Sequence, residues 1–175
     1  MSKRLPKIRP FKRGPGLTLY GYFTKGLVHP FEGVAFRKTD AVIRDWKTGQ
    51  ETFRQNDFEV TAEHTDQDTA VIASKYARGA LGTTKRETSV KQIIMRVVEK
   101  IADWGLKGRY FATVRDYDVF KNELARILIT RKAAFNSPVW FNFGVDGSPQ
   151  QGSACMPYDV RVNTNLGLIA IGDVV

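Results

Sequence analysis

Residues 135–155, FNSPVWFNFGVDGSPQQGSAC, combine the only cysteine of the chain with its densest group of aromatic and amide side chains. Asn136 and Ser137 lie beside aromatic rings, and a loop rich in Gly, Ser, Pro and Gln then leads to Cys155. Because Pro138 disfavours the helical conformation for the residue before it, the preceding helix is predicted to stop before Ser137. Such an element end exposes backbone N–H groups beside a serine hydroxyl, and these groups suit an anionic ligand such as phosphate.

The same segment also has a purely structural interpretation. Residues 139–143, VWFNF, fit a buried strand, and the Gln, Ser and Gly residues after them fit a surface loop. By pattern alone the structural interpretation is favoured. The choice between a ligand site and a purely structural segment depends on the rest of the sequence.

Length and composition predict one soluble globular domain. A chain of 175 residues, 42% of them hydrophobic, can form a real core. No apolar run approaches the ~20 residues of a membrane span, so we expect a cytoplasmic protein without a membrane partner. A single cysteine cannot form an internal disulfide, which excludes a secreted disulfide scaffold and leaves a reactive thiol. His29 and His64, the only histidines, are too far apart in sequence to predict a metal site, so each is assigned a structural role.

The net charge of +9 comes mostly from the N-terminus. Residues 1–13 hold six of the 27 basic residues and no acid, so the remaining chain carries only +3. We therefore expect residues 1–16 to form a basic flexible arm. Such an arm could steer polyanions, which makes a basic nucleic-acid-binding module an alternative class. Against a specific nucleic-acid partner, the arm lacks interleaved stacking aromatics. A helical interaction module without catalysis is a further alternative.

The middle of the chain is predicted to form a small β hairpin and three helices. Short β-like runs over residues 33–44 and 51–53 flank a Lys47-Thr48-Gly49-Gln50 turn. Capping-box-like starts predict the three helices, at Thr65 to Asp68, at Ser89 to Gln92 and at Thr113 to Asp116.

Each helix is expected to bury one face. In the first, which should end near Gly79, Tyr76 is assigned to the core, and Lys75 and Arg78 to solvent. The second has the clearest apolar stripe, and Gly105 is predicted to end it. The stripe residues of the second helix are Val90, Ile93, Ile94, Val97, Val98, Ile101 and Trp104, and those of the third are Tyr117, Phe120, Leu124, Ile127 and Leu128.

Several ordered segments resemble one enzyme family. They are Lys75-Tyr76-Ala77-Arg78, Glu87-Thr88-Ser89-Val90, Trp104-Gly105, Tyr110-Phe111, FNSPVWFN from Phe135 and Ser153-Ala154-Cys155. From about His29 to Cys155 the chain is similar to cobalamin-dependent (class II) ribonucleotide reductases. The resemblance implies an α+β fold: a mainly helical N-terminal region with a small β hairpin that leads into the first strand of a ten-stranded α/β reductase barrel, truncated here. The implied domains are a reductase N-terminal domain over 17–132 and the start of the catalytic barrel over 133–154.

In that family the barrel reduces the ribose 2′-hydroxyl of a ribonucleotide through a cysteine thiyl radical generated from adenosylcobalamin, and the product supplies DNA synthesis. By matching position, Ser137 would contact substrate phosphate, Ala154 would line the substrate and Cys155 would belong to the redox cysteine pair. The implied partners are a thioredoxin-type reductant, the rest of the reductase chain and a second copy in a homodimer. The radical cysteine and the cobalamin contacts are expected outside this chain, so the fragment would be inactive alone. The choice between di- and triphosphate substrates stays open.

After Cys155 the sequence departs from the family. Residues 155–175 resemble the first block of an intein and also read as a hairpin. The matching residues are Cys155, Asp159, Arg161-Val162, Thr164, Gly167 and Ile171-Gly172-Asp173. An intein begins with Cys because its thiol attacks the preceding carbonyl, here that of Ala154, to form a thioester. A divergent reductase strand is the alternative.

Overall fold

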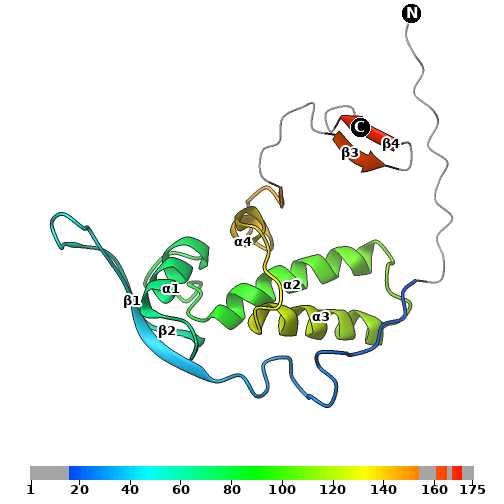
Figure 1. Cartoon of the computed structure of the whole chain (residues 1–175), viewed down its shortest axis with the longest axis horizontal. Helices are drawn as coiled ribbons and strands as arrows, with labels where there is room; N and C mark the ends of the chain where they lie inside the picture. Colours follow the sequence, from blue (N-terminus) through cyan, green and yellow to red (C-terminus); the bar gives the residue numbers. More distant parts are fainter. Residues whose placement is uncertain (1–15, 154–160, 165–166, 171–175) are drawn as a thin grey trace, which may run out of the picture.

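The computed structural model describes residues 16–153, 161–164 and 167–170 (Figure 1). In chain order the elements are β1 (Phe36–Arg44), β2 (Glu51–Thr61), α1 (Asp66–Val71), the π-helical turn η1 (Ile72–Tyr76), α2 (Val90–Lys107), α3 (Val114–Ile129), α4 (Ser137–Asn142), β3 (Arg161–Thr164) and β4 (Gly167–Ala170). The strands form two antiparallel pairs, β1 with β2 and β3 with β4. The predicted α+β class is confirmed.

The predicted hairpin is present and longer than its sequence pattern suggested. Phe36 of β1 pairs with Thr61 of β2, and Arg44 pairs with Glu51 at the other end. The turn is closed by Asp45, whose carboxylate accepts the N–H groups of Lys47 and Thr48. These bonds lower the pKa of Asp45, and the bond from the Thr48 N–H contributes most.

The core lies between the hairpin, α2 and α3. Figure 1 shows α2 and α3 side by side, with the hairpin extending from one end of the pair. The residues of the main buried cluster are Phe31, Ala41, Phe58, Val60, Ala73, Ala77, Val90, Ile93, Ile94, Val98, Ala125, Leu128 and Ile129. The predicted apolar face of the second helix is thus confirmed for its first three turns. Of the five stripe residues predicted for the third helix, Leu128 is buried as predicted, and the other four are half-buried.

The prediction that Gly105 ends the second helix is wrong. The helix continues to Lys107, and Gly108 occupies its C-cap. Gly105 is instead buried against Phe111, where a Cβ atom would lie 2.6 Å from the ring carbon Cε2. Glycine stands here because an aromatic ring approaches the backbone closely, and the helix has no reason to stop. Trp104, predicted to be buried, is 36% exposed.

The start of α2 also differs from its prediction. The Ser89 hydroxyl accepts the N–H of Lys91, as an N-cap should, and donates to Glu59. Gln92 does not close a capping box on Ser89, because its side-chain oxygen accepts the N–H of Thr88, one residue earlier. The two other predicted boxes, at the starts of α1 and α3, are both present.

The largest correction concerns residues 139–143, predicted as a strand. Residues 137–142 form the short helix α4, preceded by Asn136 in an extended conformation. The extended residue is therefore Asn136 and not Ser137, as Pro138 had predicted, and the preceding helix α3 has already ended at Ile129. Proline suits the first turn of a helix because its missing N–H would have no partner there. In the described part of the chain, residues 133–153 contain α4 and loops and no barrel strand.

The ends of the chain are described only in part. Residues 1–15 lie outside the described residues, as do Ala154 and Cys155. The hairpin predicted within 155–175 is confirmed by β3 and β4, which pair from Arg161 with Ala170 to Thr164 with Gly167. Among the described residues, no helix is long and apolar enough to cross a membrane.

One carboxylate ties the segment before the hairpin to α3, and it should make stability depend on pH. Asp116 accepts the hydroxyl of Thr113 and the N–H of Leu19, and these bonds lower its pKa. Because the folded pKa lies below the unfolded one, this stabilisation is present above the unfolded value and is lost as pH falls through the folded value. Asp116→Asn should therefore lower the free energy of unfolding at neutral pH, and the difference from the parent should shrink as the pH is lowered from neutral through the acid range. Urea unfolding across that range measures it, and a constant difference would refute the assignment.

Candidate functional site

Ser137, for which the resemblance implies a contact with substrate phosphate, is the first residue of α4 in the structure. Its hydroxyl lies 3.2 Å from the hydroxyl of Tyr76, the last residue of η1. The Tyr76 ring stacks on Phe141 with 5.3 Å between centroids and 17° between planes. Two segments singled out in the sequence, Lys75 to Arg78 and FNSPVWFN, are therefore in direct contact although 61 positions separate the hydroxyl pair.

The C-terminal end of α4 is held by Arg96 of α2. This guanidinium donates to the carbonyl of Phe143 at 2.6 Å and to that of Trp140 at 3.2 Å. A third hydrogen bond of 3.2 Å reaches the carbonyl of Tyr76. The same side chain pairs with Glu87, with 2.7 Å between Arg96 Nε and Glu87 Oε1. A cation at the carbonyl end of a helix also opposes the negative pole of the helix dipole.

Arg78 also holds α4, which corrects its assignment to solvent. Its Nε donates to the carbonyl of Phe141 at 3.1 Å, and its guanidinium lies over the Phe141 ring. The Arg78 backbone N–H donates to Glu87 at 2.7 Å. Burial lowers the pKa of Arg78, and the charge of Arg96 lowers it further, whereas Glu87 opposes both. Glu87 thus joins the two arginines that hold α4, while Lys75 is exposed as predicted.

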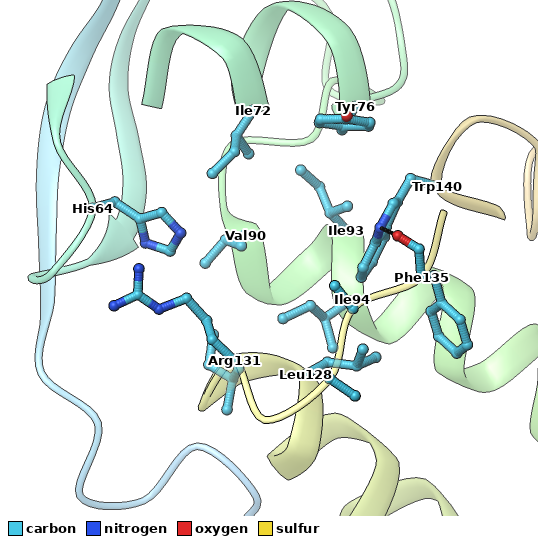
Figure 2. A pocket seen from close by; sticks show the side chains of 13 residues that line it. His64, Ile72, Tyr76, Val90, Ile93, Ile94, Leu128, Arg131, Phe135 and Trp140 are labelled. Carbon is cyan, nitrogen blue, oxygen red and sulfur yellow. Dashed lines mark hydrogen bonds between the residues drawn. The ribbon is translucent and has the colours of Figure 1, made fainter. Parts of the chain in front are cut away.

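Beneath α4 lies an apolar cavity of about 440 Å³ (Figure 2). Figure 2 shows Trp140 and Tyr76 at one end and His64 and Arg131 at the other, with the Trp140 indole N–H donating to the carbonyl of Phe135 at 3.0 Å. The lining residues are His64, Ile72, Tyr76, Val90, Ile93, Ile94, Leu128, Ile129, Arg131, Ala133, Ala134, Phe135 and Trp140. A volume of this size holds a drug-sized molecule at most. It does not fit adenosylcobalamin, a corrin that also carries a nucleotide and an adenosyl group.

Both histidines have local partners. His64 Nδ1 lies 2.6 Å from the hydroxyl of Thr61, and His29 Nδ1 accepts the N–H of Phe31 at 3.3 Å. Burial lowers the pKa of His64, and the charge of Arg131 lowers it further. Within the described ranges, no group of three or more His, Cys, Asp or Glu residues could hold a metal ion.

The loop after α4 is organised by one amide. Gln150 accepts the N–H of Gly144 through its oxygen and donates to the carbonyls of Asn142, Val145 and Ser148 through its nitrogen. The Asn142 amide in turn donates to the carbonyl of Gln151. The loop leads to Ser153, the last described residue before Ala154 and Cys155.

Sequence reasoning missed Arg96, Glu87 and Gln150 as structural centres of this site. Arg96 lies outside the apolar stripe predicted for the second helix, and a cation at such a position usually lies in water.

The contact between the loop and α2 requires glycine at position 144. Gly144 has a φ of +72°, and a Cβ atom there would lie 2.6 Å from the carbonyl oxygen of Arg96. Gly147 has a φ of +74°, and a Cβ atom built on Gly147 would have no neighbouring atom within 4 Å. It is therefore a matched control for backbone strain. Gly144→Ala should lower the free energy of unfolding by about 1–3 kcal/mol more than Gly147→Ala, the usual cost of overpacking. Chemical denaturation of both variants measures the difference, and equal losses would mean that this contact is absent.

The sequence model of a family described as "Class II vitamin B12-dependent ribonucleotide reductase" matches residues 37–131, more than half of the chain. The vitamin B12-dependent ribonucleotide reductase of Streptomyces coelicolor is 39% identical over 152 residues, which cover 87% of this chain and 16% of the relative. That of Rhodopirellula baltica is 42% identical over 117 residues, covering 66% and 11%. That of Agrobacterium fabrum is 32% identical over 169 residues, covering 74% and 13%.

The chain therefore spans about a sixth or less of the length of these relatives. The match of residues 37–131 covers all of the hairpin except Phe36, together with α1, η1, α2 and α3, and it includes Arg78 and Arg96. On this match, the chain belongs to the class II vitamin B12-dependent ribonucleotide reductases.

Proposed function

We propose that this chain supplies the N-terminal region and one wall of the substrate site of a reductase that converts ribonucleotides to deoxyribonucleotides for DNA synthesis. The observation that carries the proposal is the contact between the Ser137 and Tyr76 hydroxyls at the start of α4. It joins two of the segments that carry the resemblance to the family, Lys75 to Arg78 and FNSPVWFN. Catalysis requires the rest of the reductase chain, a thioredoxin-type reductant and adenosylcobalamin, whose contacts lie outside this chain. A cytoplasmic homodimer is the assembly that we expect.

Ser137 is proposed to bind substrate phosphate. A serine hydroxyl can donate a hydrogen bond to a phosphate oxygen while it accepts one from a neighbour such as Tyr76. Hydrogen bonds to charged groups are the stronger ones. In this arrangement Tyr76 orients the Ser137 hydroxyl and does not itself need to reach the ligand.

Ala154 and Cys155 complete the proposal at the end of the loop. Ala154 is proposed to line the substrate, where its small side chain would leave room for the nucleotide. If Cys155 belongs to the reductase, its thiol and a second thiol lose two electrons and two protons to form a disulfide as the substrate is reduced. If Cys155 begins an intein, its sulfur attacks the Ala154 carbonyl carbon, the peptide C–N bond breaks and a thioester forms.

Mass spectrometry separates the two roles of Cys155. With the missing intein segments supplied, dithiothreitol should release a fragment that ends at Ala154, and Cys155→Ala should abolish this cleavage. If the splicing-competent protein stays intact under thiol and a disulfide at Cys155 forms instead, the cysteine belongs to the reductase.

The reaction itself is tested with the full-length reductase that carries this region, with reductase sequence restored after Ala154. Deoxyribonucleotide formation should require both adenosylcobalamin and a dithiol reductant. Product formation without the cobalamin would reject the proposed reaction class.

A further inference from the structure

The placement of α4 depends on its neighbours. A helix of six residues is far shorter than the ~12–15 residues at which isolated helices become even marginally stable. Its N-terminal end contacts Tyr76 through Ser137, and its C-terminal end meets the guanidinium of Arg96. Arg96 also binds the carbonyl of Tyr76. The Arg96 side chain therefore holds α4, which carries Ser137, in a fixed position relative to Tyr76.

Arg96 is itself held in one orientation. Its side chain and that of Glu87 are only 11% and 12% exposed, and the pair is joined through Nε at 2.7 Å. The other guanidinium nitrogens are engaged by the carbonyls of Phe143, Trp140 and Tyr76. Because its donors point at Glu87 and these carbonyls, Arg96 is placed to orient α4 and not to contact a ligand.

We propose that Arg96 is a positioning residue for substrate binding, one that sets the start of α4 against Tyr76 so that the Ser137 hydroxyl faces the phosphate in a single orientation. This inference rests on the phosphate-binding role proposed for Ser137. It adds that the affinity for the nucleotide is controlled from α2, by a side chain that never touches the nucleotide.

Arg86 provides a matched control. It is also a partly buried arginine that binds backbone carbonyls, but its partners are Ala73, Ala77 and Gly79, together with the side chain of Gln55. None of these belongs to α4. Losing Arg86 should disturb the turn after η1 and should reach α4 only indirectly, through Arg78 in that turn.

Hydrogen exchange followed by mass spectrometry tests the positioning directly in the 175-residue chain. In Arg96→Ala, amides of residues 137–144 should exchange roughly tenfold faster or more, because the helix loses its anchor. In Arg86→Ala the exchange of those amides should rise by a smaller factor than in Arg96→Ala, because Arg86 makes no hydrogen bond to α4. Arg96→Lys retains the charge but lacks the planar guanidinium, so the exchange rate of these amides should lie between those of the parent and of Arg96→Ala. Unchanged exchange of residues 137–144 in Arg96→Ala would overturn the inference.

Kinetics of the full-length reductase test whether Arg96 acts through Ser137. Arg96→Ala should raise the KM for the ribonucleotide by a larger factor than it lowers kcat. In a Ser137→Ala background the further increase in KM should fall to about twofold or less, because a residue that acts through Ser137 has nothing left to position. Fully additive increases would reject the inference. An unchanged KM in Ser137→Ala alone would reject the phosphate role of Ser137, while hydrogen exchange would still decide whether Arg96 positions α4.

Discussion

Replacing Val97 by Asp is expected to destabilise the protein by about 3–5 kcal/mol, a large fraction of the roughly 5–15 kcal/mol by which domains are usually stable. Val97 lies in the middle of α2 and is completely buried. A carboxylate there would have to stay ionised without a partner or take up a proton at a cost, since burial disfavours the charged form. The free energy of unfolding in urea measures the loss.

Val114→Asp is the matched control for this change. Val114 is 70% exposed and is the first residue of α3, where a negative charge interacts favourably with the helix dipole. The same substitution should therefore be nearly neutral at this position. Similar losses for the two variants would show that burial of the α2 face does not hold the fold together.

Removing Glu87 is expected to have the second large effect. Glu87→Ala leaves the guanidinium of Arg96 and the backbone N–H of Arg78 without their shared carboxylate. Breaking a buried ion pair by deleting one partner typically costs about 3–5 kcal/mol, because the remaining charge stays buried. Thermal or urea unfolding should show this loss together with faster proteolysis after α4.

The control for Glu87→Ala is a variant at a solvent-exposed ion pair. Glu63 pairs with Arg131 while their side chains are 75% and 52% exposed. Surface pairs contribute about 0–1 kcal/mol, so Glu63→Ala should change little. If both glutamate variants lost the same stability, the network around α4 would not be the anchor described above.

The elements that the sequence predicted well are those set by local chemistry. Two capping boxes, at Thr65 and Thr113, mark helix starts correctly because the hydroxyl and the carboxylate that satisfy the first N–H groups are neighbours in sequence. The apolar stripe of α2 is visible for the same reason, since its period depends only on helical geometry. The turn at Asp45 likewise closes on itself.

The elements that sequence reasoning misplaced depend on contacts from elsewhere in the chain. The run VWFNF has the composition of a strand, yet Arg96 and Arg78 bind the carbonyls at its end and hold it as a helix. Gly105 was predicted to end the helix because the local sequence pattern does not show its contact with the ring of Phe111. That contact is the reason for glycine at this position. Of the candidate site, Ser137 was predicted from the FNSP motif, whereas Tyr76 was assigned only to packing.

The most direct test of the account is the affinity of the full-length reductase for its ribonucleotide when Ser137 becomes Ala. Losing one hydrogen bond to a charged group is worth about 1.5–3 kcal/mol, so Kd should rise roughly tenfold to a hundredfold. Ser148→Ala, a change of the same size in the loop after α4, should leave Kd unaltered. A Kd for Ser137→Ala equal to that of the parent would contradict the claim that α4 presents the phosphate-binding hydroxyl.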